Sequence, residues 1–336
     1  MSKGLCNAKN HKSVLQTTER NITNQEVQTV FLTPLTPYAA VMPRKECIMP
    51  IRLLIFTILF SMMLALAQGS VHESRSFESE ALGGTVNYSI YLPAGYDADT
   101  RAYPVVYMLH GYGGEDTDWI RYGNIAMTAD RMIAEGALPS VIIAMPDAGN
   151  SYYVNSEEYG DYETALAEEF VTYMDSNYRT IADRSSRAIG GLSMGGYGAA
   201  YYALRHPDTF AAIGVMSGAL FAEEPPSNRS QLTGDPFDED VWAEHNVFEN
   251  IEEAAASEQR CGWPPPSEKC LSFFINVGDD DQLGLHTDAV LFYNALVEAE
   301  FPAELRIHNG DHAWGFWAEH VDEVLAHFAA TFARYY

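Results

Sequence analysis

The chain has 336 residues. Because α/β folds often use roughly 250 residues as one unit, we expect a single large domain behind a leader. Its 46 acidic residues against 20 basic residues give a formal net charge of −26. A surface of this charge repels nucleic acid and anionic lipid, so the composition argues against binding to either polyanion.

The first predicted element is a secretory signal peptide over residues 49–67. Its apolar stretch, Leu53–Ala67, is uncharged and about fifteen residues long, whereas a membrane-spanning helix needs on the order of 20. Arg52 precedes this stretch, and Ala65-Leu66-Ala67 has the small-x-small pattern of a signal peptidase site, so we expect cleavage after Ala67. An uncleaved N-terminal anchor is the alternative. In both cases the following domain is secreted or periplasmic, and after cleavage we expect no stable membrane association.

Residues 1–48 precede this signal and are polar and aperiodic. Because a signal peptide normally begins at the initiator methionine, we expect translation to start at Met49. If residues 1–48 are translated, they are expected to be disordered, since they lack the apolar periodicity needed to bury a core. Removing residues 1–67 takes away seven of the 20 basic and three of the 46 acidic residues, which makes the net charge about −30.

Residues 68–336 are the expected α/β domain, because short apolar or β-branched runs alternate there with longer amphipathic runs. Thr85–Leu92 alternates with period two and predicts an early antiparallel strand. Further strands are predicted at Pro104–Leu109, Val141–Met145, Ala188–Ile189, Ile213–Met216, Ser272–Val277 and Glu304–His308. The first two of these are continuous apolar runs, which are typical of strands buried on both faces. Helical spacing is found at Ile125–Glu135, Tyr162–Met174, Gly195–Arg205, His286–Ala299 and Trp317–Phe332. This order is that of an α/β hydrolase, with a mostly parallel central sheet flanked by helices.

The segment 221–269 departs from this alternation, because it is long, rich in proline and acidic residues, and contains at most one expected helix, near Val241–Ala256. Long insertions in compact domains are often lids or binding loops, so we expect a partial lid before the penultimate strand. A solvated decoration is the alternative. Cys261 and Cys270 lie nine positions apart in a chain expected to be exported, which predicts one local disulfide. Two free thiols are the alternative, and a zinc site would require two further ligands.

The sharpest local motif is Gly191-Leu192-Ser193-Met194-Gly195, which follows an apolar strand and opens a helix rich in small residues. A serine on such a turn has a strained backbone, and a glycine two residues away on either side avoids clashes and lets the helix pack closely. The helix N-terminus also places N–H groups where negative charge develops. Ser193 is therefore the candidate nucleophile, and a purely structural glycine turn is the alternative.

A serine hydroxyl needs a base, and His312 lies in a loop just after the last predicted strand, where this fold presents its base. Other histidines are better explained as structural or surface residues, namely His110, His206, His320 and His327. A carboxylate that orients the base is expected directly after the penultimate strand. Spacing alone leaves Asp279, Asp280 and Asp281 as equal candidates. These acids are also compatible with a Ca²⁺ site, although no second set of oxygen ligands is evident.

The oxyanion hole is expected to combine the backbone N–H of Met194 with one N–H from the run His110-Gly111-Tyr112-Gly113-Gly114. Glycines in this run let the backbone approach a substrate oxygen. Losing one such donor typically costs roughly 3 to 4 kcal/mol of transition-state stabilisation.

Over roughly Phe77–Phe332 the chain resembles the putative esterase (esterase D-like) family, which includes feruloyl and acetyl xylan esterases, tributyrin esterase and antigen 85 mycolyltransferases. The resemblance rests on a set of short motifs: Tyr91-Leu92-Pro93, Leu109-His110-Gly111, Tyr159-Gly160-Asp161-Tyr162, Gly190-Gly191-Leu192-Ser193-Met194-Gly195-Gly196, His206-Pro207-Asp208, and the G-x-x-D-x-L and G-x-H-x-W patterns. It implies Asp281 as the acid and Tyr112 and Met194 as the oxyanion donors. It also implies no metal and no organic cofactor.

The expected function is that of a secreted serine esterase in which Ser193, His312 and Asp281 form and hydrolyse an acyl-enzyme. The expected substrates are short-acyl, acetyl or feruloyl esters, either small molecules or esters linked to a polysaccharide. Residues expected to contact the substrate are Gly111, Trp119, Tyr159 and Trp314. One alternative is an acyltransferase to a sugar hydroxyl, and another is a non-catalytic binding protein with the same fold. The acyl and alcohol groups and the oligomeric state do not follow from the sequence.

Overall fold

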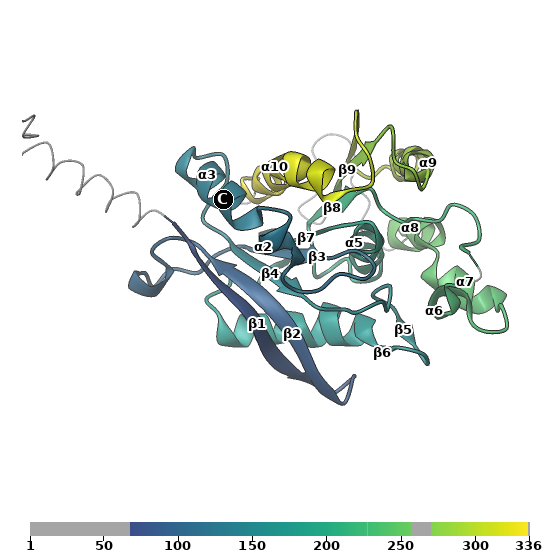
Figure 1. The fold of residues 1–336 in the computed structure, drawn as a ribbon, viewed down its shortest axis with the longest axis horizontal. Coiled ribbons are helices and arrows are strands. Elements are labelled where there is room, and N and C mark those ends of the chain that lie inside the picture. Colours follow the sequence, from purple (N-terminus) through teal and green to yellow (C-terminus); the bar gives the residue numbers. More distant parts are fainter. Residues whose placement is uncertain (1–67, 227, 257–269, 335–336) are drawn as a thin grey trace, which may run out of the picture. The chain divides into compact units, whose positions relative to one another are not determined.

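The structure, a computed structural model, describes residues 68–226, 228–256 and 270–334 (Figure 1). The predicted extension (1–48), the predicted signal peptide (49–67) and Cys261 lie outside these residues, so those predictions stay predictions. Cys270 is buried. Among the described helices, none combines the length and the apolarity that a membrane crossing requires.

In the described part of the chain, eight strands form one sheet in the order β1-β2-β4-β3-β7-β8-β9-β10. The strands are β1 (Ser70–Ser79), β2 (Gly84–Leu92), β3 (Val105–Leu109), β4 (Ile142–Pro146), β7 (Arg187–Leu192), β8 (Ala212–Met216), β9 (Ser272–Gly278) and β10 (Ala303–His308). Pairs β1/β2 and β2/β4 are antiparallel, and every neighbouring pair from β4 to β10 is parallel. A short hairpin, β5 (Asn155–Ser156) with β6 (Gly160–Asp161), lies outside this sheet. The predicted mostly parallel sheet is therefore confirmed.

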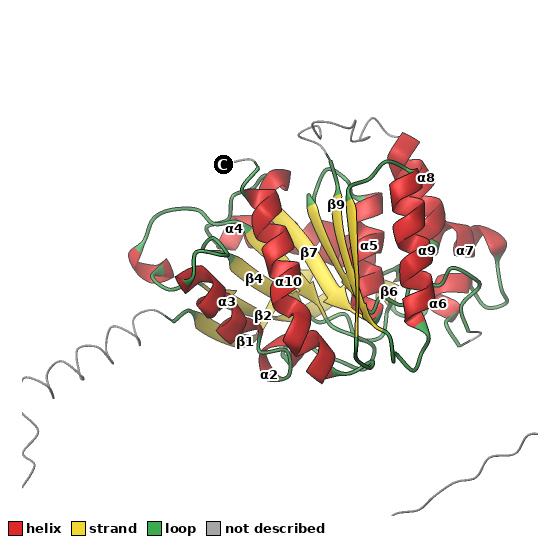
Figure 2. Cartoon of the chain, turned by 90° about the horizontal axis from the view of Figure 1, so that it is seen from above, coloured by secondary structure: helices red, strands yellow, loops and turns green. Residues whose placement is uncertain are grey.

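The helices cover both faces of the sheet (Figure 2). One face carries α3 (Ile125–Ala134) and α10 (Trp314–Phe332), which pack against each other. The opposite face carries α4 (Phe170–Asn177), α5 (Met194–Arg205) and α9 (Leu285–Glu298). Three short helices lie between these elements, at η1 (Tyr96–Ala98), α2 (Asp118–Arg121) and η3 (Arg184–Ser186). The helix predicted at Tyr162–Met174 is a π-helical stretch, η2 (Thr164–Glu169), that continues directly into α4.

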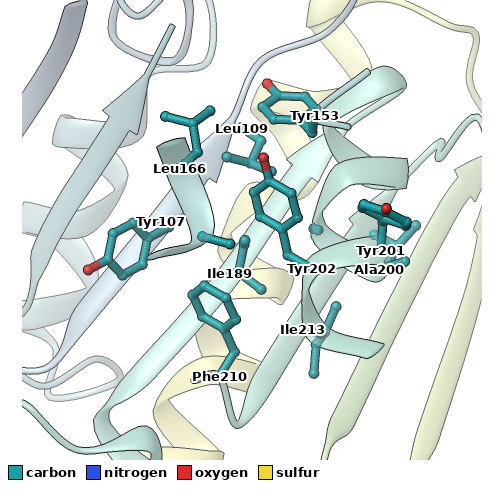
Figure 3. Close-up of a cluster of buried hydrophobic side chains, with 14 of the residues drawn as sticks. Tyr107, Leu109, Tyr153, Leu166, Ile189, Ala200, Tyr201, Tyr202, Phe210 and Ile213 are labelled. Atoms are coloured by element: carbon teal, nitrogen blue, oxygen red, sulfur yellow. The ribbon is translucent and has the colours of Figure 1, made fainter. Parts of the chain in front are cut away.

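Two cores result because alternate side chains of the central strands point to opposite faces. Every residue of β3 is buried. Val105, Tyr107 and Leu109 enter the core under α5, whereas Val106 and Met108 enter the core under α10. Figure 3 shows the first of these cores, where side chains of β3 meet Ile189 and the tyrosines of α5. A sheet buried on both faces explains why its strands appear in the sequence as continuous apolar runs.

The segment 221–269 contains three helices within its described residues, so the prediction of at most one helix is wrong. They are α6 (Ser230–Thr233), α7 (Glu239–His245) and α8 (Val247–Ala256). Asn246 has an extended backbone and its side-chain oxygen accepts a hydrogen bond from the N–H of Phe248, which separates α7 from α8. Helix α8 packs against α5 and α9, and Ile251 and Ala254 are buried in the core under α5. The predicted role of this segment as a lid stays a prediction.

One buried carboxylate, that of Glu163, ties the start of η2 to the end of α5. Its Oε1 accepts hydrogen bonds from Arg205 Nε at 2.8 Å and His206 Nε2 at 2.9 Å, and its Oε2 accepts from the Tyr201 hydroxyl at 2.9 Å. Burial alone raises the pKa of this carboxyl, but the hydrogen bonds from His206 and Arg205 outweigh it and lower the pKa from 4.5 to about 2. Glu163 therefore stabilises the folded state in its ionised form.

We expect Glu163→Gln to lower the free energy of unfolding by about 3 kcal/mol near pH 6. Because the folded-state pKa lies below the unfolded-state value, this stabilisation is complete above about pH 4.5 and is lost as the pH falls toward 2. The cost of the substitution should therefore shrink to roughly 1 kcal/mol at pH 3, measured by urea unfolding. Glu168→Gln, an exposed position on the same stretch, is the matched control. A cost that is equal at both pH values would contradict this assignment.

Candidate active site

The candidate nucleophile, Ser193, lies on the turn between β7 and α5. Its backbone has φ 53° and ψ −119°, a region that residues with a side chain rarely adopt. The turn is held from β8, since the N–H of Ser193 donates to the carbonyl oxygen of Met216 at 2.9 Å. A Cβ atom at Gly191 would lie 2.4 Å from the carbonyl oxygen of Gly195, and one at Gly195 would lie 2.5 Å from that of Leu109. Both glycines of the motif are therefore required for the turn to fit beside β3.

Three residues that follow the carboxyl ends of β7, β9 and β10 meet in one hydrogen-bonded chain. His312 Nε2 lies 3.0 Å from Ser193 Oγ, and His312 Nδ1 lies 2.8 Å from Asp281 Oδ2. Among the three described aspartates left open by spacing, Asp281 is buried and contacts the histidine, whereas Asp279 and Asp280 are exposed. Because the strands are parallel, their carboxyl ends share one edge of the sheet, which explains how positions so far apart in the sequence come together.

The imidazole of His312 is fixed on several sides. The carboxylate of Asp281 can only accept, so Nδ1 of His312 carries the hydrogen and Nε2 is free to accept from the Ser193 hydroxyl. The other carboxylate oxygen of Asp281 accepts from the N–H of Leu283 at 2.9 Å. The ring of Trp317 meets the imidazole edge-on at 5.0 Å between centroids. The arrangement is that of a histidine prepared to take a proton from the serine.

The loop after β3 is braced next to Ser193. The N–H of Gly114 donates to the carbonyl oxygen of Gly111 at 3.0 Å, and the N–H of Gly113 donates to Asn150 Oδ1 at 2.6 Å. His110 is buried, accepts from the N–H of Ala148 at Nε2 and donates from Nδ1 to the carbonyl oxygen of Gly111. His110 thus has the structural role that its position before the glycines predicts.

The two predicted oxyanion donors both lie close to the serine, Met194 as the next residue in the chain and Tyr112 in the wall of the same pocket. Tyr112 belongs to the braced loop and lines the pocket over Ser193. Met194 is the first residue of α5, so its backbone N–H lies outside the helix's own hydrogen-bond ladder. Their function as donors to a substrate oxygen stays a prediction.

A pocket of about 240 Å³ lies over the serine. The described residues that line it are Gly111, Tyr112, Gly113, Gly114, Asp118, Leu192, Ser193, His312, Trp314 and Trp317. A larger hollow of about 770 Å³ is apolar and lies at the other end of α10, away from the serine and the histidine. We place the candidate active site in the smaller pocket, because it contains the groups that can do chemistry.

Two of the four residues predicted to contact substrate, Gly111 and Trp314, line this pocket, and two lie elsewhere. Trp119 is 1% exposed and donates its indole N–H to the carbonyl oxygen of Leu109 at 2.9 Å. Its ring packs edge-to-face against the ring of Trp314. Tyr159 lines a separate hollow of about 260 Å³, which shares no lining residue with this pocket. The prediction for Trp119 is therefore corrected to a supporting position, because its ring is covered on all sides.

Two residues at the site were not found from the sequence. Asp118 lines the pocket, and burial raises the pKa of its carboxyl. Arg229, from the segment 221–269, places its guanidinium 4.7 Å above the ring of Tyr112 and donates to the hydroxyl of Tyr152 at 2.9 Å. Asp118 lies only four residues after the glycine loop, so its position in the sequence could have indicated that it lines the pocket. No local sequence pattern indicates that Arg229 lies at the site.

A strained serine on a strand-to-helix turn, at the carboxyl edge of a mostly parallel sheet and beside a histidine, defines an α/β-hydrolase fold. Residues 79–328 match the model of the family described as Putative esterase. The chain belongs to this family, as the motifs predicted.

Similar proteins carry esterase names. A solved structure described as a ferulic acid esterase is 30% identical, has a TM-score of 0.67, and the alignment covers 79% of this chain and 99% of that one. The protein named Endo-1,4-beta-xylanase/feruloyl esterase from Xylanibacter ruminicola is 32% identical over 161 residues, 44% of this chain and 22% of that protein. An acetyl esterase from Caldicellulosiruptor saccharolyticus is 26% identical over 236 residues, 67% of this chain and 83% of that protein. The chain thus spans about a fifth of the length of the Xylanibacter ruminicola protein, the first of the curated relatives.

Proposed function

We propose that this chain is a serine carboxylic-ester hydrolase that acts through an acyl-enzyme. The observation that supports it is the continuous hydrogen-bonded chain from Ser193 Oγ through the imidazole of His312 to the carboxylate of Asp281. Nucleophile, base and orienting acid in contact at the bottom of a pocket are what an acyl transfer requires. Membership in the Putative esterase family supports the same chemistry.

In the first half of the proposed reaction, Ser193 Oγ attacks the ester carbonyl carbon while its proton passes to His312 Nε2. The carbonyl π electrons move onto the oxygen, which the N–H groups of Tyr112 and Met194 stabilise. The tetrahedral species then collapses and breaks the bond to the alcohol oxygen, which takes the proton from His312 Nε2. The buried carboxylate of Asp281 stabilises the imidazolium that exists between these proton transfers.

In the second half, water takes the place of the alcohol. His312 Nε2 accepts a proton from the water as its oxygen attacks the acyl carbon. Collapse of the second tetrahedral species breaks the bond to Ser193 Oγ, returns the proton to the serine and releases the carboxylic acid. In each half-reaction His312 Nε2 accepts one proton and then donates it, so protons are conserved and the proposed reaction needs no cofactor.

The proposed substrates are acetyl, other short-acyl and feruloyl esters, either small or linked to a polysaccharide. A pocket of about 240 Å³ with the indole rings of Trp314 and Trp317 in its wall offers an apolar surface to a short or flat acyl group. The names of the relatives, feruloyl esterase and acetyl esterase, support these two classes. Export through cleavage after Ala67 is part of the proposal, since polysaccharide-linked esters lie outside the cell.

A fluorophosphonate probe tests the proposal directly, because it labels a serine only when a base activates it. We expect stoichiometric labelling of the purified protein, mapped to Ser193 by mass spectrometry, and no labelling of urea-unfolded protein. Absence of labelling in the folded protein would favour a non-catalytic binding protein. A panel of p-nitrophenyl acetate, methyl ferulate and acetylated xylan then ranks the substrates. Diversion of the acyl group to an added sugar, in place of free acid, would favour the acyltransferase.

A further inference from the structure

Three side chains that could hold a metal ion gather beside the candidate active site, on β10 and α10. His308 is the last residue of β10, and His320 and Glu323 lie one turn apart on α10. His308 Nε2 lies 3.0 Å from Glu323 Oε2, and His320 Nδ1 lies 3.5 Å from Glu323 Oε1. The two imidazole rings are stacked, with their centroids 4.0 Å apart and an interplanar angle of 13°. One ligand atom from each residue can be chosen so that all three lie within 4.8 Å of one another.

The nitrogen-to-oxygen separations are close to those of a tetrahedral ion. Zinc binds imidazole nitrogen and carboxylate oxygen at about 2.0–2.1 Å, so two ligand atoms of a tetrahedral site are about 3.3 Å apart. The two nitrogen-to-oxygen separations lie on either side of that value, 3.0 Å from His308 Nε2 to Oε2 of Glu323 and 3.5 Å from His320 Nδ1 to Oε1 of the same carboxylate. Two imidazoles and one carboxylate are also a donor set that zinc accepts, and a water molecule would complete the tetrahedron. With one ligand atom from each residue, all three lie within 4.8 Å of one another, so binding an ion requires the side chains to draw closer together.

The charges of the cluster favour a divalent cation as well. The single carboxylate of Glu323 lies within reach of both imidazoles, whose rings are stacked, so two nitrogen donors and one anionic oxygen donor face the same point. The side chains are 25%, 14% and 34% exposed, in the order His308, His320, Glu323, so an ion in solution can reach them.

The cluster is built against the loop that carries His312. Phe316 closes its inner side, with its ring 6.3 Å from that of His308 and 4.7 Å from that of His320. Gly310 lies directly on this ring, because a Cβ atom there would be 2.5 Å from it. The short loop from residue 309 to residue 313 thus runs between the end of β10 and the start of α10, the two elements that the cluster joins.

We propose that His308, His320 and Glu323 form a zinc-binding site that clamps the end of β10 to α10. The site binds Zn²⁺ through His308 Nε2, His320 Nδ1 and one carboxylate oxygen of Glu323. It restrains the loop of His312 from outside the pocket and takes no part in acyl transfer. The proposal is independent of the esterase activity, because it concerns binding and stability alone.

The test is isothermal titration of ZnCl₂ into the full-length protein, prepared without a histidine tag and stripped with EDTA. We expect one equivalent of Zn²⁺ to bind and to raise Tm. His320→Gln and Glu323→Gln should each weaken binding at least about tenfold, since even residues that only support metal ligands change affinity by roughly 10- to 100-fold. Glu319→Gln, the same change at an exposed position of α10, should bind like the wild type.

Other outcomes would overturn the site. They are no stoichiometric binding by the wild type, unchanged binding in the His320 and Glu323 variants, or loss of binding in His312→Ala, which would move the ion to the catalytic histidine. Should either ligand variant fail to fold, X-ray absorption at the zinc edge of the loaded wild type replaces it. A first shell with two imidazoles would support the site, and a shell of oxygen alone would refute it.

Discussion

Replacing Ser193 by alanine is expected to lower kcat toward p-nitrophenyl acetate by roughly 10⁶-fold, the size of effect seen when a nucleophile is removed from such a triad. The methyl group of alanine cannot form the acyl-enzyme, and no other described hydroxyl contacts His312 Nε2. Some hydrolysis should remain, because the pocket and the N–H groups around it still bind substrate and stabilise charge. Steady-state kinetics and the release of p-nitrophenol measure this directly.

The Ser193→Ala protein should keep its fold, since the strained turn depends on the glycines at 191 and 195 and on the hydrogen bond to Met216. Circular dichroism and Tm check this point. Ser176→Ala is a suitable control, because Ser176 is exposed on α4 and its hydroxyl donates only to the carbonyl oxygen of Thr172. Turnover by Ser193→Ala within tenfold of the wild type would refute the assignment of the nucleophile.

Asp281→Asn is expected to lower kcat by roughly 10⁴-fold with little change in the fold. Asparagine can donate its side-chain N–H to His312 Nδ1, which would then have to accept, so the hydrogen would move to Nε2. In that tautomer Nε2 cannot take the proton of Ser193. The side chain of Asp281 is fully shielded from solvent, so water cannot replace the lost carboxylate.

The matched control for Asp281→Asn is Asp280→Asn, the same change at the preceding, exposed position. We expect Asp280→Asn to keep wild-type kcat and KM. Equal losses in both variants would indicate a general charge effect of this acidic turn. A normal rate in Asp281→Asn would show that another group orients the histidine.

The fold was predictable where buried side chains produce a recognisable pattern of apolar residues in the sequence. Strands buried on both faces are continuous apolar runs, and the helices that cover them repeat with helical spacing. The edge strand β1 was missed because most of its side chains are exposed and only Phe77 and Ser79 are buried. The break between α7 and α8 was missed because it depends on one side chain, that of Asn246, which accepts a hydrogen bond from the backbone just after it.

The site was predictable where a residue type is tied to a local turn. Ser193 and its two glycines form such a turn, and His312 follows the last strand of the sheet. Choosing Asp281 among three adjacent aspartates required the family resemblance, since spacing treats them alike. Arg229 and the cluster of His308, His320 and Glu323 are formed by tertiary contacts between separate elements, so no spacing in the sequence indicates them.

The position of β10 has a consequence for synthesis of the protein. Among the described strands it is the last in the chain, it pairs only with β9 at one edge of the sheet, and the loop of His312 follows it. A ribosome-bound chain that has been made as far as Asp281, just after β9, would already contain the serine and the aspartate, yet it would lack the proton acceptor. Under the proposed mechanism, Ser193 therefore becomes reactive only after the C-terminal strand and helix have left the ribosome and packed against the sheet. Incomplete chains would not hydrolyse esters.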